Sequence, residues 1–212
     1  MATTFKSLTT SDKVSTRTLL HEAIPLTGTI LSGTYSDNNI KNFSHGMFQS
    51  VYDYPYLSSS ANHIMDITIG YSADSSLSRS NSIQQSKKIN IYNQMAQVLV
   101  GHDHTGAILK FDQDGDIVSG GTKLNECFFL NFSRLLTKDE IKKGSFAITV
   151  MTGGTYAART HDLVISDSGA ANDYRVNSPA GEYAVLYPEN GPSRGRKVGL
   201  IYYQAGIVVL TA

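Results

Sequence analysis

Two histidines, in the segment His102-Asp-His104, are the first residues whose type and spacing suggest chemistry. In an extended backbone, alternate residues lie on one face, so both imidazoles can approach the same transition-metal ion. A zinc site also needs ligands from elsewhere in the chain. Because the pair follows Gly101 and precedes Thr105-Gly106, a solvated turn explains these residues without a metal. His102 and His104 stay the metal candidates, but we prefer the turn and predict no bound metal.

The segment Asp112-Gln-Asp-Gly-Asp116 places three carboxylates at alternate positions, as the first part of a calcium-binding loop does. The complete loop requires glycine at its sixth position and glutamate at its twelfth. Here those positions hold Ile117 and Lys123, and a lysine cannot supply the bidentate carboxylate. The segment is therefore predicted to be a solvated turn.

Catalytic and cofactor motifs are absent from the sequence. The chain has no Gly-x-Ser-x-Gly nucleophile elbow and no glycine-rich phosphate loop. Its single cysteine, Cys127, lies in an apolar run, where burial raises the pKa of a thiol and makes it unreactive. We expect a protein that is not an enzyme and has no cofactor and no small-molecule substrate.

The charge pattern excludes further classes of function. Eighteen basic and 18 acidic residues give no net charge, and no long run of one sign occurs, so we expect no binding to nucleic acid. No apolar stretch is long enough to span a membrane, and no secretory signal begins the chain. Charged residues make up only 17 %, and Ser, Thr, Asn, Gly and 12 tyrosines take their place. Such surfaces suit contacts between proteins.

The spacing of apolar residues predicts an α+β, mainly β fold, with an antiparallel β-sandwich or barrel and one principal helix at about 83–100. The chain is expected to form a single domain over 1–212, with a Ser-rich loop at 72–82. A hairpin is predicted around Asp114-Gly115, and a capping box at Thr137-Lys-Asp-Glu140 predicts one helical turn. The predicted strands cover residues 63–71, 126–132, 145–151, 161–166, 182–187, 197–203 and 206–211, and the second of these is apolar on both faces and hence central.

Two segments are predicted to contact neighbouring subunits. Residues 43–57 contain five Phe and Tyr rings and a proline, which suits an extended arm better than a central strand. The last two strands would leave apolar surface uncovered unless another subunit covers them. The predicted interface residues are Phe48, Tyr52, Tyr54, Tyr56, Leu200, Tyr202, Tyr203, Val208 and Leu210.

Four segments carry a resemblance to a known group of proteins. They are Thr18-Leu-Leu-His-Glu-Ala-Ile-Pro25, Phe43-Ser-His-Gly-Met-Phe-Gln-Ser-Val-Tyr-Asp-Tyr-Pro-Tyr56, Lys88-Ile-Asn-Ile-Tyr-Asn-Gln-Met-Ala96 and Gly199-Leu-Ile-Tyr-Tyr-Gln-Ala-Gly-Ile-Val-Val-Leu210. In these segments the chain resembles virion structural proteins of T-even-like contractile-tailed bacteriophages, notably those of cyanobacteria. The resemblance implies a tail, baseplate or neck component without catalytic residues. It also implies that further sequence follows Ala212.

The resulting prediction is a non-enzymatic structural subunit of a phage virion that assembles into the tail baseplate or neck. Its expected partners are other virion structural proteins and copies of itself, and it would be synthesised in the host bacterial cytoplasm. A carbohydrate- or receptor-binding module of a tail fibre, with tyrosines stacked on sugars, is the first alternative. A metal-dependent hydrolase of the particle, using His102 and His104, is the second.

Overall fold

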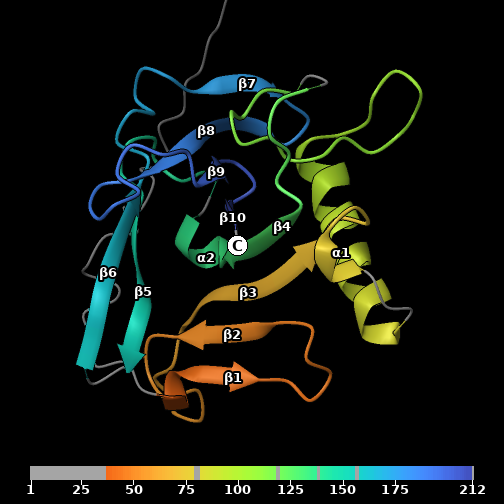
Figure 1. Cartoon of the computed structure of the whole chain (residues 1–212). Coiled ribbons are helices and arrows are strands. Elements are labelled where there is room, and N and C mark those ends of the chain that lie inside the picture. The colour runs from red at the N-terminus through yellow and green to blue at the C-terminus, as the bar shows by residue number, and fades with distance from the viewer. Residues whose placement is uncertain (1–36, 79–81, 118–119, 138, 156–157, 212) are drawn as a thin grey trace, which may run out of the picture.

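The computed structural model describes residues 37–78, 82–117, 120–137, 139–155 and 158–211. These residues form a curled antiparallel sheet of ten strands that resembles half a barrel, with one long helix against it (Figure 1). The prediction of a mainly β, α+β fold is confirmed. The strand order is β1-β2-β3-β4-β10-β9-β8-β6-β5, and β7 pairs with β8 beside this path. The strands are β1 (Ile40–Asn42), β2 (Gln49–Tyr52), β3 (His63–Tyr71), β4 (Glu126–Phe132), β5 (Ala147–Thr155), β6 (Ala158–Ser166), β7 (Arg175–Ser178), β8 (Gly181–Pro188), β9 (Gly199–Tyr202) and β10 (Ile207–Thr211).

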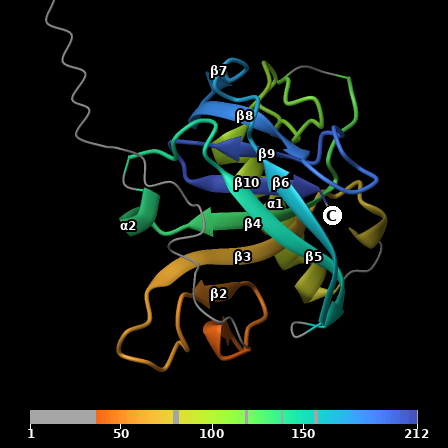
Figure 2. The ribbon, with the colours of Figure 1, turned by 90° about the vertical axis from the view of Figure 1, so that its left-hand side faces the viewer.

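The sheet has an apolar core on each of its two faces. Helix α1 (Ile83–Leu99) covers one face, and the β5–β6 hairpin crosses the other, in front of β10, β4 and β3 in Figure 2. In β4, Cys127 and Phe129 belong to the core beneath α1, whereas Leu130 and Phe132 belong to the core beneath the hairpin. Successive strand residues point to opposite faces, so a strand covered on both sides must be apolar throughout. The prediction that 126–132 is a central strand is confirmed.

The C-terminal strands lie at the centre of the sheet. β10 pairs with β4 on one side and with β9 on the other, and β9 pairs with β8. Their side chains alternate between the two cores. Leu200 and Tyr202 join the core beneath α1, whereas Tyr203, Val208 and Leu210 join the core beneath the hairpin.

The expectation that these two strands are left open for a neighbouring subunit is therefore wrong. All five predicted interface residues in them are buried by the chain itself: Leu200, Tyr202, Tyr203, Val208 and Leu210. The segment is apolar because its strands lie at the centre of a sheet that is covered on both faces.

Helix α1 begins and ends where its sequence predicts. The side chain of Ser82 caps it by accepting a hydrogen bond from the backbone N–H of Gln85, and Gly101, with φ of 93°, follows its end. Its buried face contains Tyr92, Ala96 and Leu99. These residues recur at helical spacing and pack with Cys127 and Phe129 of β4, and the helix also contacts β3.

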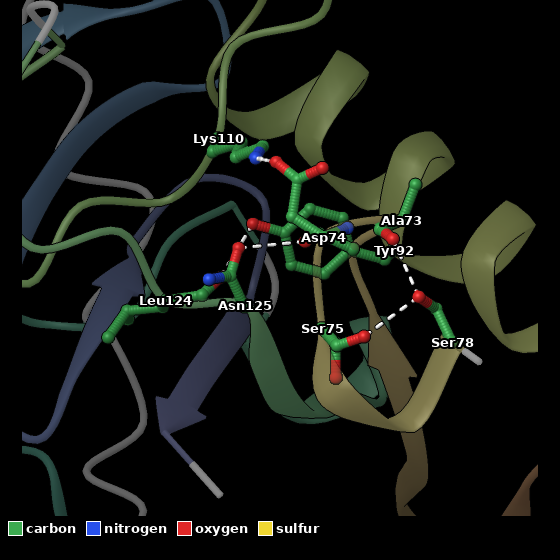
Figure 3. Close-up of polar contacts among 9 residues, drawn as sticks. Ala73, Asp74, Ser75, Ser78, Tyr92, Lys110, Leu124 and Asn125 are labelled. Carbon is green, nitrogen blue, oxygen red and sulfur yellow. Dashed lines mark hydrogen bonds and ion pairs between the residues drawn. The ribbon is translucent and has the colours of Figure 1, made fainter.

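A polar network ties the turn after β3 to the loop that precedes β4 (Figure 3). Lys110 forms an ion pair with Asp74, and Ser72 Oγ donates to Asn125 Oδ1 at 2.7 Å. Beside them, Tyr92 Oη of α1 donates to the carbonyl of Leu124 at 2.6 Å. Ser78 closes the turn on the carbonyl oxygens of Ala73 and Ser75.

The described part of the Ser-rich segment is thus a hydrogen-bonded turn in which Ser72 and Ser75 are buried. Residues 79–81 of that segment lie outside the described residues.

The predicted strands at 63–71, 126–132, 145–151, 161–166, 182–187, 197–203 and 206–211 correspond to β3, β4, β5, β6, β8, β9 and β10. Two smaller predictions are wrong. Within the described residues, which leave out 118–119, the Asp114-Gly115 turn joins no pair of strands, and an isolated antiparallel bridge links Asp112 to Lys123. The helical turn expected to begin at the capping box Thr137-Lys-Asp-Glu140 is not found among the described residues, which leave out 138; a short helix, α2 (Arg134–Thr137), ends there instead. Both are short segments whose local signals do not outweigh the packing around them.

Candidate functional site

The aromatic segment 43–57 forms part of the sheet instead of an extended arm. Residues 43–48 are the turn between β1 and β2, and β2 lies between β1 and β3. The loop after β2 is held by hydrogen bonds from Asp53 N to Asn62 O and from Tyr56 N to Asn38 O. The arm prediction is therefore wrong about the shape of this segment, although the segment does present aromatic rings at the surface.

The exposure of the four predicted contact residues differs. Phe48 is 37 % exposed, Tyr54 is 53 % exposed and Tyr56 is 37 % exposed, while Tyr52 is half-buried. Large apolar side chains at this exposure can be covered by a partner. The structure thus leaves Phe48, Tyr54 and Tyr56 accessible for the predicted contact, unlike the five C-terminal residues.

Phe48 lies in a depression between the β1–β2 turn, β3 and α1, which we call the loop–helix groove. It has two adjoining parts of about 240 and 400 Å³. Met47, Phe48 and Thr68 line both parts. The remaining lining residues are Asn42, Phe43, His45, Gly46, Gln49, Ile67, Ile69, Lys88, Ile91, Gln94, Met95 and Phe128.

Three rings of the β1–β2 turn pack on one another along this groove. Phe43 and His45 are stacked with centroids 5.3 Å apart, and Phe48 lies 4.8 Å from Phe43 and 5.1 Å from His45. The Nζ of Lys41 lies over the Phe43 ring at 5.0 Å. Because the rings hold each other in place, they form a pre-organised apolar surface that loses little side-chain entropy on contact.

Lys88 is the charged residue that lines the groove. Its Nζ donates to the carbonyl oxygen of Met47 at 3.2 Å, which ties α1 to the β1–β2 turn. Burial lowers the pKa of Lys88, because an ammonium group loses hydration there. No ion pair joins Lys88 to a carboxylate within the described residues. The groove is thus apolar with one cationic group.

A second polar and aromatic cluster surrounds the start of β3. Asp66 Oδ1 accepts hydrogen bonds from Ser50 Oγ at 2.5 Å and pairs with His63 Nε2 at 3.0 Å. Tyr52 lies beside His63, with ring centroids 5.5 Å apart. The serine bonds to the carboxylate and not to the imidazole, so this arrangement differs from a nucleophilic Ser-His-Asp triad, in which histidine takes the serine proton.

The loop that carries Tyr54 and Tyr56 is organised by Asp53. Both carboxylate oxygens of Asp53 accept hydrogen bonds from Asn62, at 2.6 Å from its backbone N and 2.8 Å from its side chain. Burial alone would raise the pKa of Asp53, but these hydrogen bonds outweigh it and lower the pKa. The Tyr52 and Tyr56 rings are tilted by 43° and do not form one flat platform.

The two metal candidates lie in an exposed turn. His102 and His104 are both exposed, and the intervening Asp103 accepts hydrogen bonds from Thr105 and from the backbone of Ala107. The Thr105 side chain is the main reason that the pKa of Asp103 is lowered. Across the ranges that the structure describes, no three His, Cys, Asp or Glu side chains come together in a way that could hold a metal ion.

In the carboxylate-rich segment 112–116, two carboxylates form ion pairs with lysines. Lys123 Nζ lies 2.7 Å from the buried carboxylate of Asp112, and Lys197 pairs with Asp114. Lys123 is the residue at the twelfth position of the apparent calcium pattern. The side chain that breaks the pattern thus provides the positive charge that a calcium ion would otherwise supply.

Cys127 is fully buried in β4, and burial is the main reason that its pKa rises to about 12. Its Sγ lies 3.7 Å from the carbonyl oxygen of Leu124. The prediction of a buried thiol with a raised pKa is confirmed.

Sequence reasoning missed the helix side of the groove. Ile91, Gln94 and Met95 of α1 line it, and none of them is among the predicted interface residues. The sequence feature that could have indicated this wall of the groove is the width of the apolar stripe on α1. Ile91 and Met95 are four residues apart and lie beside the stripe of Tyr92, Ala96 and Leu99, so the helix has more apolar surface than the sheet alone covers.

None of the described helices is both long and apolar enough to cross a bilayer. Comparison of the chain with protein-family models, with curated proteins and with solved structures gives no match.

Proposed function

We propose that this chain is a non-enzymatic structural subunit that acts by contact with other proteins, and that it belongs to the tail baseplate or neck of a contractile-tailed phage particle. The single observation that carries the proposal is the loop–helix groove. It is an accessible apolar surface lined by packed rings.

Three properties of the groove favour a protein partner. Its rings are fixed by mutual packing, so binding orders few side chains. Aromatic residues and methionine, which are enriched in protein interfaces, line it together. It also lies beside the end of a strand, where backbone groups can pair with another chain. The virion itself is proposed on the resemblance of four sequence segments to phage structural proteins.

A glycan-binding role is the second proposal, and the exposure of Tyr54 and Tyr56 favours it. Tyrosine faces can stack on sugar rings, but recognition also needs polar groups that are free to bind hydroxyls. In this loop Asp53 and Asn62 bind each other. We therefore place glycan binding after protein contact. Specific binding of the isolated protein on a glycan array, lost in Tyr54→Ala, would reverse that order.

Quantitative mass spectrometry of tailed particles tests the proposal. The particles are purified by density gradient from the culture that produces the protein. We expect the chain at a fixed copy number per particle, unchanged by a high-salt wash, because an apolar contact is not screened by salt. Absence of the chain from the washed particles would contradict a structural role in the virion.

A further inference from the structure

At the groove, the backbone N–H and C=O groups of one residue of β3 have no strand partner among the described residues. In an antiparallel pair, alternate residues direct both backbone groups toward the same neighbouring strand. Ser72 N donates to Asn125 O and Ser133 N donates to Ile64 O, so the even-numbered residues of β3 face β4. The odd-numbered residues face β2. Met65 and Ile67 pair there with Val51 and Gln49, and β2 begins at that point.

Ile69 is the next residue of β3 that faces the β2 side. Continuing the register by one pair would place Met47 opposite it. Met47 is not available, because its N–H donates to His45 Nδ1 at 3.0 Å, while its carbonyl accepts from Thr68 Oγ1 and Lys88 Nζ. No other described residue gives Ile69 a strand partner on this side, so its N–H and C=O face the groove that it lines.

The side chains around Ile69 indicate which kind of segment the groove can bind. Phe43, Phe48 and Phe128 line the same part of the groove, which favours apolar side chains. Lys88 is the charged residue in that lining and lacks a carboxylate partner within the described ranges, and Lys41 lies close by over Phe43. The local charge is positive, so an acidic group is complementary.

We propose that the loop–helix groove binds an extended segment of a partner protein, which pairs with the backbone of Ile69, places apolar side chains against Phe48 and Phe128, and directs an Asp or Glu carboxylate to Lys88. This is β-strand addition at a locally open edge, in which backbone pairing supplies affinity and side-chain pockets supply specificity. The inference rests on the proposed function as a protein-contact subunit and adds the kind of segment recognised.

Amide hydrogen exchange of the free protein tests the open edge. We expect the Ile69 amide to exchange about tenfold faster or more than those of Thr68 and Gly70, whose N–H groups face β4. Equal protection of the three amides would overturn the proposal, because it would mean that Ile69 already has a partner.

Binding of a defined probe tests the occupant. The probe is a library of synthetic seven-residue peptides in which Val alternates with Asp, Asn, Lys or Thr. We expect Asp-containing members to bind and to slow exchange of the Ile69 amide. Lys88→Met should weaken the Asp peptides about fivefold and remove their advantage over the Asn peptides. Lys87→Met, at an exposed lysine outside the groove lining, is the matched control and should leave binding unchanged.

Three results would overturn the proposal: no binding by any member, binding without protection of Ile69, or no preference for Asp. Retention of the wild-type amide spectrum outside the groove shows that Lys88→Met is folded. The two proposals fail separately. Presence of the chain in particles without peptide binding contradicts only the groove assignment, and peptide binding without presence in particles contradicts only the virion role.

Discussion

At the scale of single residues, one buried carboxylate holds several elements together. Asp167 is almost fully buried and accepts hydrogen bonds from the backbone N–H groups of Gly144 and Phe146, both at 2.8 Å, and from Tyr203 Oη at 2.9 Å. These donors satisfy a charge that would otherwise be costly to bury. Tyr203, which the sequence suggested as a contact for a neighbour, thus serves the interior of the molecule.

Removing the Tyr203 hydroxyl should destabilise the fold. Tyr203→Phe keeps the ring in the core and deletes one hydrogen bond to Asp167, so we expect a loss of about 2 kcal/mol in the free energy of unfolding. Urea unfolding measures the change. Tyr54→Phe, at an exposed tyrosine, is the matched control and should change stability by less than about 0.5 kcal/mol. Equal stabilities of the two variants would contradict the internal role of Tyr203.

The raised pKa of Cys127 predicts a loss of stability in alkali. The thiol ionises near pH 8.5 in an unfolded chain and at about 12 in the fold, so between these values the folded state holds a proton that the unfolded state has lost. The stabilisation is complete below pH 8.5 and decreases above it, by up to about 1.4 kcal/mol per pH unit.

Urea unfolding from pH 8 to 10 tests this prediction. Cys127→Ala has no ionisable group at this position, so its stability should fall less steeply with pH than that of the wild type. Parallel curves for the two proteins would show that the thiol is not shielded from solvent. Reaction with a thiol reagent should likewise occur only after unfolding, because the thiolate is the reactive form.

At the scale of elements, the contact of α1 with β3 depends on a glycine. A Cβ added to Gly70 would lie 2.9 Å from Tyr92 N and 3.1 Å from Lys88 O, both of which belong to the backbone of the helix. The helix therefore rests directly on the strand at this point. This close approach also sets the position of Lys88, and hence the helix wall of the groove.

Substitution of Gly70 should displace α1. Gly70→Ala forces the helix backbone away from β3, and we expect a loss of about 1 to 3 kcal/mol in thermal or urea unfolding. Gly169→Ala is the matched control, because nothing lies within 4 Å of the added Cβ there. A Gly70→Ala protein as stable as the Gly169→Ala protein would mean that the helix does not pack on the strand as closely as described.

The helices and strands that follow a local sequence pattern could be predicted from the sequence. Which strands lie next to one another in the sheet could not. The alternation in 63–71 and the double-sided apolar run in 126–132 predict β3 and β4 within their observed bounds. The helical spacing of apolar residues, which Gly101 ends, predicts α1. That β10 lies between β4 and β9 is a pairing of segments distant in sequence, and no local pattern encodes it. The open-edge interpretation of the last strands failed for this reason.

The same distinction holds for the candidate site. The accessible rings Phe48, Tyr54 and Tyr56 could be identified from the composition and the proline of their segment. The groove could not, since it arises where three elements meet: the β1–β2 turn, β3 and α1. The open backbone of Ile69 depends on hydrogen bonds of Met47 that only the folded turn creates.

At the scale of the whole molecule, the described residues bury two apolar cores and leave the loop–helix groove accessible at the surface. Two cores on opposite faces of the sheet bury the central strands, and α1 and the β5–β6 hairpin cover them (Figures 1 and 2). In the proposed function, a partner protein covers the groove and is not required to complete the fold. This account predicts that the isolated chain folds and that assembly depends on the groove.

Site-specific photo-cross-linking in purified particles tests this claim most directly. A benzophenone amino acid is placed at position 48, in the groove, and in a separate protein at position 135, where the wild-type Leu135 is highly exposed on α2. We predict a cross-link from position 48 to another structural protein of the particle, identified by mass spectrometry, and little or none from position 135. Absence of a product at position 48, or equal yields at the two positions, would contradict the account.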